Sequence, residues 1–89
     1  MTRMATELIP GVDHTVEERV QAVPSLTARQ RQVLLGMCRG LTSRMIAAQL
    51  GIAQKTVEAH RYEIYLRLGA HNAAEAVFKA LNATGDGLT

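Results

Sequence analysis

Apolar residues recur at helical spacing in four consecutive segments of this chain, and small or turn-forming residues separate the segments. The segments cover roughly residues 27–39, 43–50, 54–68 and 73–82. Each shows apolar positions three or four residues apart, the spacing that places them on one face of an α-helix. The pattern therefore predicts an all-α fold with four main helices.

Capping residues agree with this periodicity at several helix ends. Thr27 and Gln30 have the spacing of a capping box, and Asn72 and Glu75 repeat that spacing before the last segment. Glycine follows each of the first three segments, where a left-handed residue commonly ends a helix. These predicted helix ends are Gly40, Gly51 and Gly69.

The second and third predicted helices are joined by a very short connection. The second stops at Gly51, and the third begins two or three residues later. Two helices joined by so tight a turn must cross at a steep angle, which is the geometry of a helix-turn-helix unit. Such a unit can place its second helix in the major groove of DNA.

The N-terminal part of the chain has a weaker signal. Val16, Val20 and Val23 form a stripe that ends at Pro24, and they predict an additional short helix over residues 15–22. This helix would pack on the domain or on a dimer partner; a linker from a larger regulator explains the segment equally well. We expect residues 1–24 to be an extension, 25–82 the folded domain and 83–89 a disordered tail.

The last predicted helix is apolar nearly all round, although a short terminal helix usually has a polar outer face. The surplus apolar surface predicts a second copy of the chain as partner. The alternative is that its alanines are simply good helix formers on a solvated face. The residues expected at the dimer interface are Ala73, Ala74, Val77, Phe78 and Leu81.

Charge is unevenly distributed along the chain. Residues 1–24 carry two basic and four acidic side chains, whereas residues 25–82 carry eight basic and three acidic ones. The basic excess therefore coincides with the predicted helix-turn-helix unit, as phosphate binding requires.

Other classes of function find little support in the sequence. The single cysteine, Cys38, lies among apolar residues and is predicted to be a core residue in a reducing, cytoplasmic environment. His14, His60 and His71 are not at ligand spacing, and no nucleophile-base pair or phosphate loop is present. We therefore expect neither an enzyme nor a bound metal or cofactor. No apolar run approaches the roughly 20 residues that span a membrane.

Several short motifs in register resemble one family, the LuxR/FixJ-type (GerE-like) helix-turn-helix DNA-binding domain. They are Leu26-Thr27-x-Arg29, Arg31-x-Val33-Leu34, Gly40-Leu41-Thr42, Ile46-Ala47, Leu50-Gly51-Ile52, Lys55-Thr56-Val57-x-x-His60 and Leu68-Gly69. The resemblance covers about residues 25–82. It implies a scaffold helix, a recognition helix and a dimerising last helix, in that order.

Domains of this kind usually form the output part of a response regulator or a related transcription regulator, below a receiver or ligand-binding domain. Neither domain fits in 24 residues, so the resemblance implies an excised output domain or a minimal regulator. The chain also departs from the family pattern. Gln30 and Gln32 stand where the family usually has Glu, Ala53 replaces a usual Ser, and Glu58 stands where a Lys or another polar residue is common.

The exposed face of the third predicted helix supplies the candidate DNA contacts. Ala59 is spaced to contact a thymine methyl, Tyr62 to reach a base or a phosphate, and Glu58 to accept from cytosine N4. A solvated Glu58, or one paired with Arg61 or Tyr62, is the alternative. The residues predicted to contact phosphates are Lys55, Thr56 and Arg61, with Arg44 and Arg67 as weaker candidates.

His60 borders the predicted core stripe, because it lies three residues after Val57 and four before Ile64. Its imidazole is expected to be hydrogen-bonded inside the fold; a DNA contact is the alternative.

The leading functional hypothesis is a sequence-specific transcription regulator that binds double-stranded DNA as a homodimer, with RNA polymerase as a further candidate partner. The main alternative is a protein-interaction module that pairs with a related regulator and binds DNA weakly. A sigma-factor-like promoter-binding domain has a similar start, but Thr56-Val57-x-x-His60 and the apolar last helix argue against it.

Overall fold

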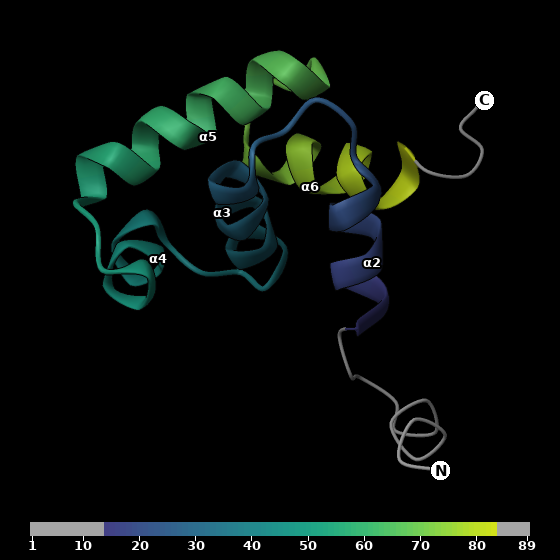
Figure 1. Ribbon diagram of the computed structural model, residues 1–89. Coiled ribbons are helices and arrows are strands. Elements are labelled where there is room, and N and C mark those ends of the chain that lie inside the picture. Colours follow the sequence, from purple (N-terminus) through teal and green to yellow (C-terminus); the bar gives the residue numbers. More distant parts are fainter. Residues whose placement is uncertain (1–13, 84–89) are drawn as a thin grey trace, which may run out of the picture.

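Five α-helices make up residues 14–83, the part of the 89-residue chain that this computed structural model describes (Figure 1). They are α2 (His14–Ala22), α3 (Ala28–Cys38), α4 (Ser43–Leu50), α5 (Gln54–Leu68) and α6 (Ala73–Ala83). No strand occurs among these residues. The predicted all-α fold with an additional N-terminal helix is therefore confirmed. Apart from Ala83, which ends α6, the predicted disordered tail over residues 83–89 lies outside the described residues.

Local capping explains where α3 and α4 begin. The Thr27 hydroxyl accepts a hydrogen bond from the Gln30 backbone N–H at 3.1 Å, and the Gln30 side chain accepts from the Thr27 N–H at 3.0 Å. This is the capping box that the sequence predicts. The Thr42 hydroxyl caps α4 by accepting from the Met45 N–H at 3.1 Å. Gly40, Gly51 and Gly69 all have positive φ, between 69° and 80°, at the predicted helix ends.

The start of α6 differs slightly from the predicted capping box. Asn72 accepts from the Glu75 N–H at 2.8 Å, as expected. The Glu75 carboxylate, however, accepts from the His71 backbone N–H at 2.7 Å, one residue before the cap, and lies 2.9 Å from His71 Nδ1. These hydrogen bonds from His71 stabilise the charged carboxylate and lower the pKa of Glu75.

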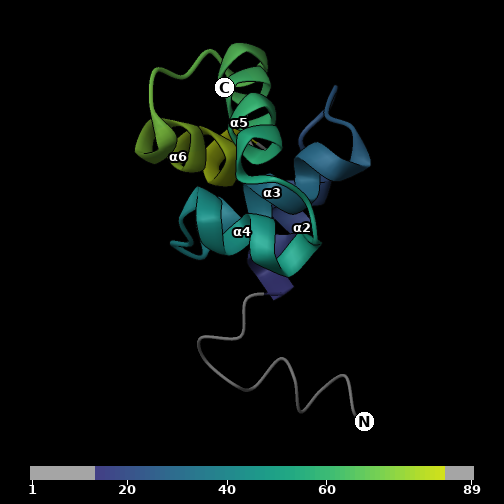
Figure 2. The same cartoon turned by 90° about the vertical axis from the view of Figure 1, so that its left-hand side faces the viewer.

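One continuous hydrophobic core joins all five helices, with α3 between α2 and α5 (Figures 1 and 2). Cys38 is packed against this core, and burial raises the pKa of its thiol to about 11. The predicted core role of Cys38 is consistent with both observations. The buried apolar residues are Val20, Val23, Leu26, Val33, Leu34, Met37, Ile46, Ala47, Val57, Ile64, Ala76 and Ala80.

Helix α2 is an integral part of this core. Val20 and Val23 expose 0% and 2% of their surface. Arg31 of α3 donates to three carbonyl oxygens at the end of α2, those of Val20, Gln21 and Val23, at 3.3, 3.3 and 2.6 Å. Arg19 of α2 donates to the carbonyl of Leu81 in α6 at 2.6 Å. Helix α2 thus packs on α3 and α6.

Candidate nucleic-acid interface

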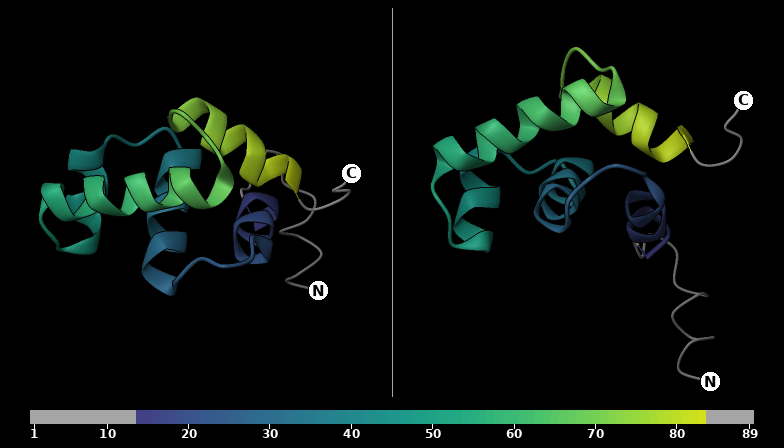
Figure 3. Two further views of the ribbon diagram at one scale, coloured as in Figure 1. Left: turned by 90° about the horizontal axis from the view of Figure 1, so that it is seen from above. Right: turned by 45° about the horizontal axis from the view of Figure 1, so that its top comes forward.

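Helices α4 and α5 are joined by three residues and cross at a steep angle (Figure 3). Gly51 makes this connection possible, because its left-handed backbone (φ 69°) ends α4 and turns the chain sharply. Val57 and Ile64 are fully buried and hold α5 against the core. Helix α5 runs along one edge of the molecule, so its opposite side faces away from the other helices (Figure 1).

The predicted base-reading residues do come together on this outer side. Glu58, Ala59 and Tyr62 are all exposed, and Tyr62 exposes 61% of its surface. Positions 58 and 62 are one helical turn apart, so the three side chains line one strip of the helix surface. Leu66, 58% exposed and one further turn along, extends the strip and was missed by the sequence reasoning.

Glu58 has a partner that the sequence reasoning did not name. The Gln54 side-chain amide donates to the Glu58 carboxylate at 3.1 Å, and both residues are exposed. The predicted alternative paired Glu58 with Arg61 or Tyr62, but Arg61 instead donates to the Tyr65 hydroxyl at 3.2 Å. The i, i+4 spacing of Gln54 and Glu58 is the signal that could have identified their contact.

The predicted phosphate-binding residues differ in their surroundings. Lys55 and Thr56 are exposed in the first turn of α5, and Arg44 is exposed in the first turn of α4. Arg61 is half-buried beside Tyr65. Helices α4 and α5 therefore each present a basic side chain in their first turn, as contact with a DNA backbone requires.

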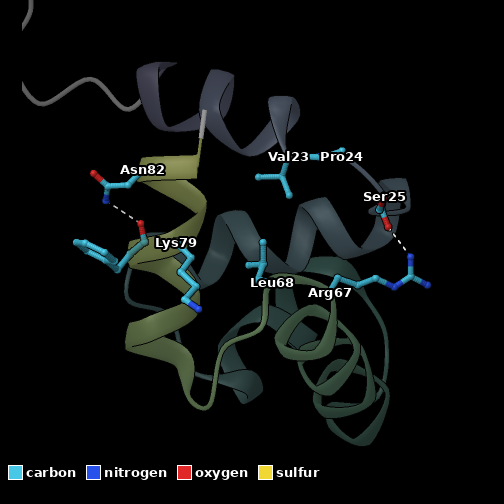
Figure 4. Close-up of a pocket in the computed structure, with 8 residues that line it drawn as sticks. Val23, Pro24, Ser25, Arg67, Leu68, Lys79 and Asn82 are labelled. Atoms are coloured by element: carbon cyan, nitrogen blue, oxygen red, sulfur yellow. Dashed lines mark hydrogen bonds between the residues drawn. The ribbon is translucent and has the colours of Figure 1, made fainter. Parts of the chain in front are cut away.

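Arg67 has a tertiary contact that the sequence does not predict. Its guanidinium donates to the carbonyl of Ser25 at 2.7 Å (Figure 4). Ser25 lies in the turn between α2 and α3 and has a positive φ of 69°, uncommon for a residue other than glycine. Arg67 thus fixes this turn at the edge of a groove whose lining includes Val23, Leu68 and Lys79.

Two further predictions concern α5. Ala53, which replaces a usual Ser of the family, occupies the N-cap position of α5, and its side chain makes no capping hydrogen bond. His60 is half-buried next to the core stripe. The hydrogen-bonded and the DNA-contacting interpretations of His60 both stay predictions.

The residues predicted for the dimer interface divide into two groups on α6. Ala73 and Val77 pack against the core of the same chain, next to the buried Ala76 and Ala80. Ala74 and Phe78 face outward, and Phe78 exposes 66% of its surface. Leu81 is half-buried. The outward surface of α6 is therefore narrower than the sequence alone indicates.

None of the described helices combines the length and apolar character needed to cross a membrane. Within residues 14–83, no group of three histidine, cysteine or acidic side chains is placed to hold a metal ion.

Comparison with known proteins agrees with the fold and with the motifs. Residues 24–80 match the family described as bacterial regulatory proteins, luxR family. Because the match covers most of the chain, the chain belongs to the LuxR family. This is a family of DNA-binding, helix-turn-helix transcription regulators and not a class of enzymes, and the predicted family is confirmed.

Individual relatives are transcription regulators from several bacteria. The chain is 45% identical over 53 residues to the probable transcriptional regulatory protein SgaR of Hyphomicrobium methylovorum, covering 60% of this chain and 25% of that protein. It is 35% identical over 79 residues to the probable transcriptional regulatory protein NarL of Mycobacterium tuberculosis, covering 88% and 37%. It is 34% identical over 61 residues to the transcriptional regulatory protein FixJ of Bradyrhizobium diazoefficiens, covering 68% of this chain and 30% of that protein.

The aligned parts thus span between a quarter and somewhat over a third of the length of these relatives. No solved structure gave a significant match.

Proposed function

We propose that this chain binds double-stranded DNA sequence-specifically, in the cytoplasm, as the DNA-binding part of a transcription regulator. The observation that carries the proposal is how α5 is packed and exposed. Its inner side is anchored by the fully buried Val57 and Ile64, and its outer side exposes Glu58, Ala59 and Tyr62. A rigidly held helix with one open face is the element that reads base edges in a major groove.

The contacts divide by their chemistry. Glu58, Ala59 and Tyr62 face the bases, while Lys55, Thr56 and Arg61 bind phosphates on either side of the groove. Arg44 adds a phosphate contact from α4. Arg67 contributes only its positive charge, because its side chain is engaged with Ser25. Phosphate contacts set the position of α5, and base contacts set the sequence.

The DNA-bound form is a homodimer joined through α6. The exposed Ala74 and Phe78 support this part of the proposal, together with the half-buried Leu81. A small residue one turn before an exposed aromatic side chain allows two α6 helices to approach closely. Two α5 helices would then read half-sites about 10 base pairs apart. RNA polymerase is the further partner through which a bound dimer would affect transcription.

A protein-interaction module is the second candidate, and the outward carboxylate of Glu58 favours it. A negative charge in the middle of the recognition surface is repelled by DNA phosphates. On that reading, α6 pairs with the corresponding helix of a related regulator, and α5 contributes little DNA affinity.

Selection of bound sequences from a random DNA pool, followed by a salt titration on the selected duplex, tests the proposal. We expect a palindromic consensus and an affinity that falls steeply as salt rises. Lys55→Ala should lower the affinity about equally for all sequences and reduce the salt slope by about one. Absence of any binding at low salt would exclude DNA recognition and favour the interaction module.

A further inference from the structure

We propose that Glu58 reads a cytosine in each half-site and that Gln54 is the positioning residue that holds its carboxylate. This inference rests on the proposed function, because it names the base that the α5 surface recognises. It concerns the base that Glu58 selects and the role of Gln54, whose contact with Glu58 is seen in the fold.

The contact between Gln54 and Glu58 restricts the carboxylate. Gln54 Nε2 lies 3.1 Å from Glu58 Oε2, with both side chains exposed on consecutive turns of α5. One carboxylate oxygen therefore has a donor from its own helix. The other oxygen does not take part in this bond and can accept from DNA. The neighbouring Ala59 is exposed and small, so it leaves room for a base edge beside the carboxylate.

The chemistry of the major groove then selects the base. A carboxylate only accepts hydrogen bonds, and cytosine presents its N4 amino group there as a donor. Guanine presents the acceptors N7 and O6, and thymine presents O4, so both would repel Glu58. Adenine offers its N6 amino group but places the acceptor N7 beside it. Cytosine is the base that provides a donor without an adjacent acceptor.

Gln54 affects this choice by holding the Glu58 side chain in one arrangement. An exposed Glu side chain has several rotamers, and fixing one of them on binding costs free energy. The hydrogen bond from Gln54 reduces the number of arrangements before DNA arrives. DNA phosphates disfavour the negative charge of the Glu58 carboxylate, and the Gln54 amide donates a hydrogen bond to that charge. Removing Gln54 should therefore weaken the preference for cytosine without changing which base is preferred.

Sequence selection with four proteins tests the proposal: the wild type, Glu58→Gln, Gln54→Ala and Glu63→Gln. We expect the wild type to enrich a cytosine at one position of each half-site. Glu58→Gln should change that position to adenine, because a glutamine can accept from N6 and donate to N7. On matched duplexes that differ only there, the wild type should prefer cytosine about ten-fold, and Glu58→Gln should reverse the order.

Glu63→Gln is the control for charge. Glu63 is exposed on the same helix, and its substitution removes the same single negative charge. It should keep the wild-type consensus. Gln54→Ala should keep cytosine with a several-fold smaller preference, at unchanged helical content in circular dichroism.

The outcomes separate this inference from the proposed function. If the wild type enriches a consensus and Glu58→Gln enriches the same one at every position, the reading of cytosine is wrong while DNA recognition stands. If Gln54→Ala discriminates as well as the wild type, Gln54 is not a positioning residue. If the wild type enriches no sequence at all, the proposed function fails, and this inference fails with it.

Discussion

Gly36 shows how a single missing side chain sets the distance between two helices. It is buried in α3, and a Cβ atom added there would lie 2.7 Å from Cγ1 and 2.9 Å from Cδ1 of Ile46 in α4. Ile46 is itself 2% exposed and has little space into which it could move. Glycine at this position therefore allows α4 to sit close against α3.

Gly36→Ala should lower the free energy of unfolding by about 1–2 kcal/mol. The steric conflict costs about 1–3 kcal/mol, and the better helix propensity of alanine offsets up to about 1 kcal/mol of it. Urea denaturation of the wild type and the variant measures the difference. The double variant Gly36→Ala, Ile46→Ala should lose less free energy of unfolding than the sum of the losses of the two single variants. Additive effects would contradict a direct contact.

At this scale, the sequence predicts residues whose role is local. Thr27 and Gly51 act on backbone groups within four residues, so spacing alone identifies them. Gly36 could not be identified in this way, because its partner Ile46 is in another helix. The contact between Arg67 and Ser25 was missed for the same reason, since 42 positions separate the two residues.

Among the elements, α5 combines a well-buried inner face with a poor start. Ala53 has the extended backbone of an N-cap residue (φ −72°, ψ 147°) but no acceptor in its side chain. Ala53→Ser should place a hydroxyl within reach of the first-turn N–H groups and raise the free energy of unfolding by about 1 kcal/mol. Thermal denaturation measures the change. Ala59→Ser, in the exposed middle of the same helix, is the control and should not stabilise the protein.

Helix α2 depends on Arg31, which donates to three carbonyl oxygens at its end. Arg31→Ala should lower the free energy of unfolding by about 1–3 kcal/mol, because two partly buried carbonyl oxygens, those of Val20 and Val23, lose a charged donor. Arg29→Ala removes an exposed arginine from α3, the helix that also carries Arg31, and should change the free energy of unfolding by at most about 0.5 kcal/mol. Equal effects of the two substitutions in urea denaturation would contradict this role of Arg31.

The helix bounds illustrate what periodicity can and cannot establish. The predicted bounds of α5, 54–68, agree with the structure, because Gly51 ends the preceding helix shortly before α5 begins and Gly69 ends α5. The valine stripe also predicts α2, but periodicity alone does not show what a helix packs against. The buried positions of Val20 and Val23 and the hydrogen bonds from Arg31 of α3 show that α2 packs on the rest of the domain.

For the whole molecule, the exposed aromatic side chain on α6 supports self-association. Phe78→Glu should convert the proposed dimer to a monomer and weaken binding to a palindromic site, because it places a charge in an apolar contact. Sedimentation velocity without DNA measures the first effect. Met45→Glu is the matched control, since Met45 is also exposed, at 49%, but lies on α4. Equal sedimentation together with equal binding to the palindromic site by wild type and Phe78→Glu would rule out α6 as the interface.

The candidate site was predictable from the sequence only in part. The helical period places Glu58, Ala59 and Tyr62 on one face, and the structure shows all three exposed. The period alone does not reveal which side chains have other partners. Arg67 is engaged with Ser25, and Glu58 is held by Gln54; both contacts depend on side-chain conformation as well as position.

The arginine contacts described above, together with one made by Lys79, also determine how the fold responds to acid. Arg19, Arg31, Arg67 and Lys79 all donate to backbone carbonyl oxygens, Lys79 to that of Gly69 at 2.8 Å. Backbone carbonyl groups do not titrate as the pH falls. The carboxylate of Glu75 behaves differently: its lowered pKa adds stability above the ordinary glutamate pKa, and this stability is lost as the pH falls through the lowered value. Acid below the ordinary glutamate pKa should therefore loosen the start of α6, while the carbonyl contacts that join α2, α3 and α5 are kept.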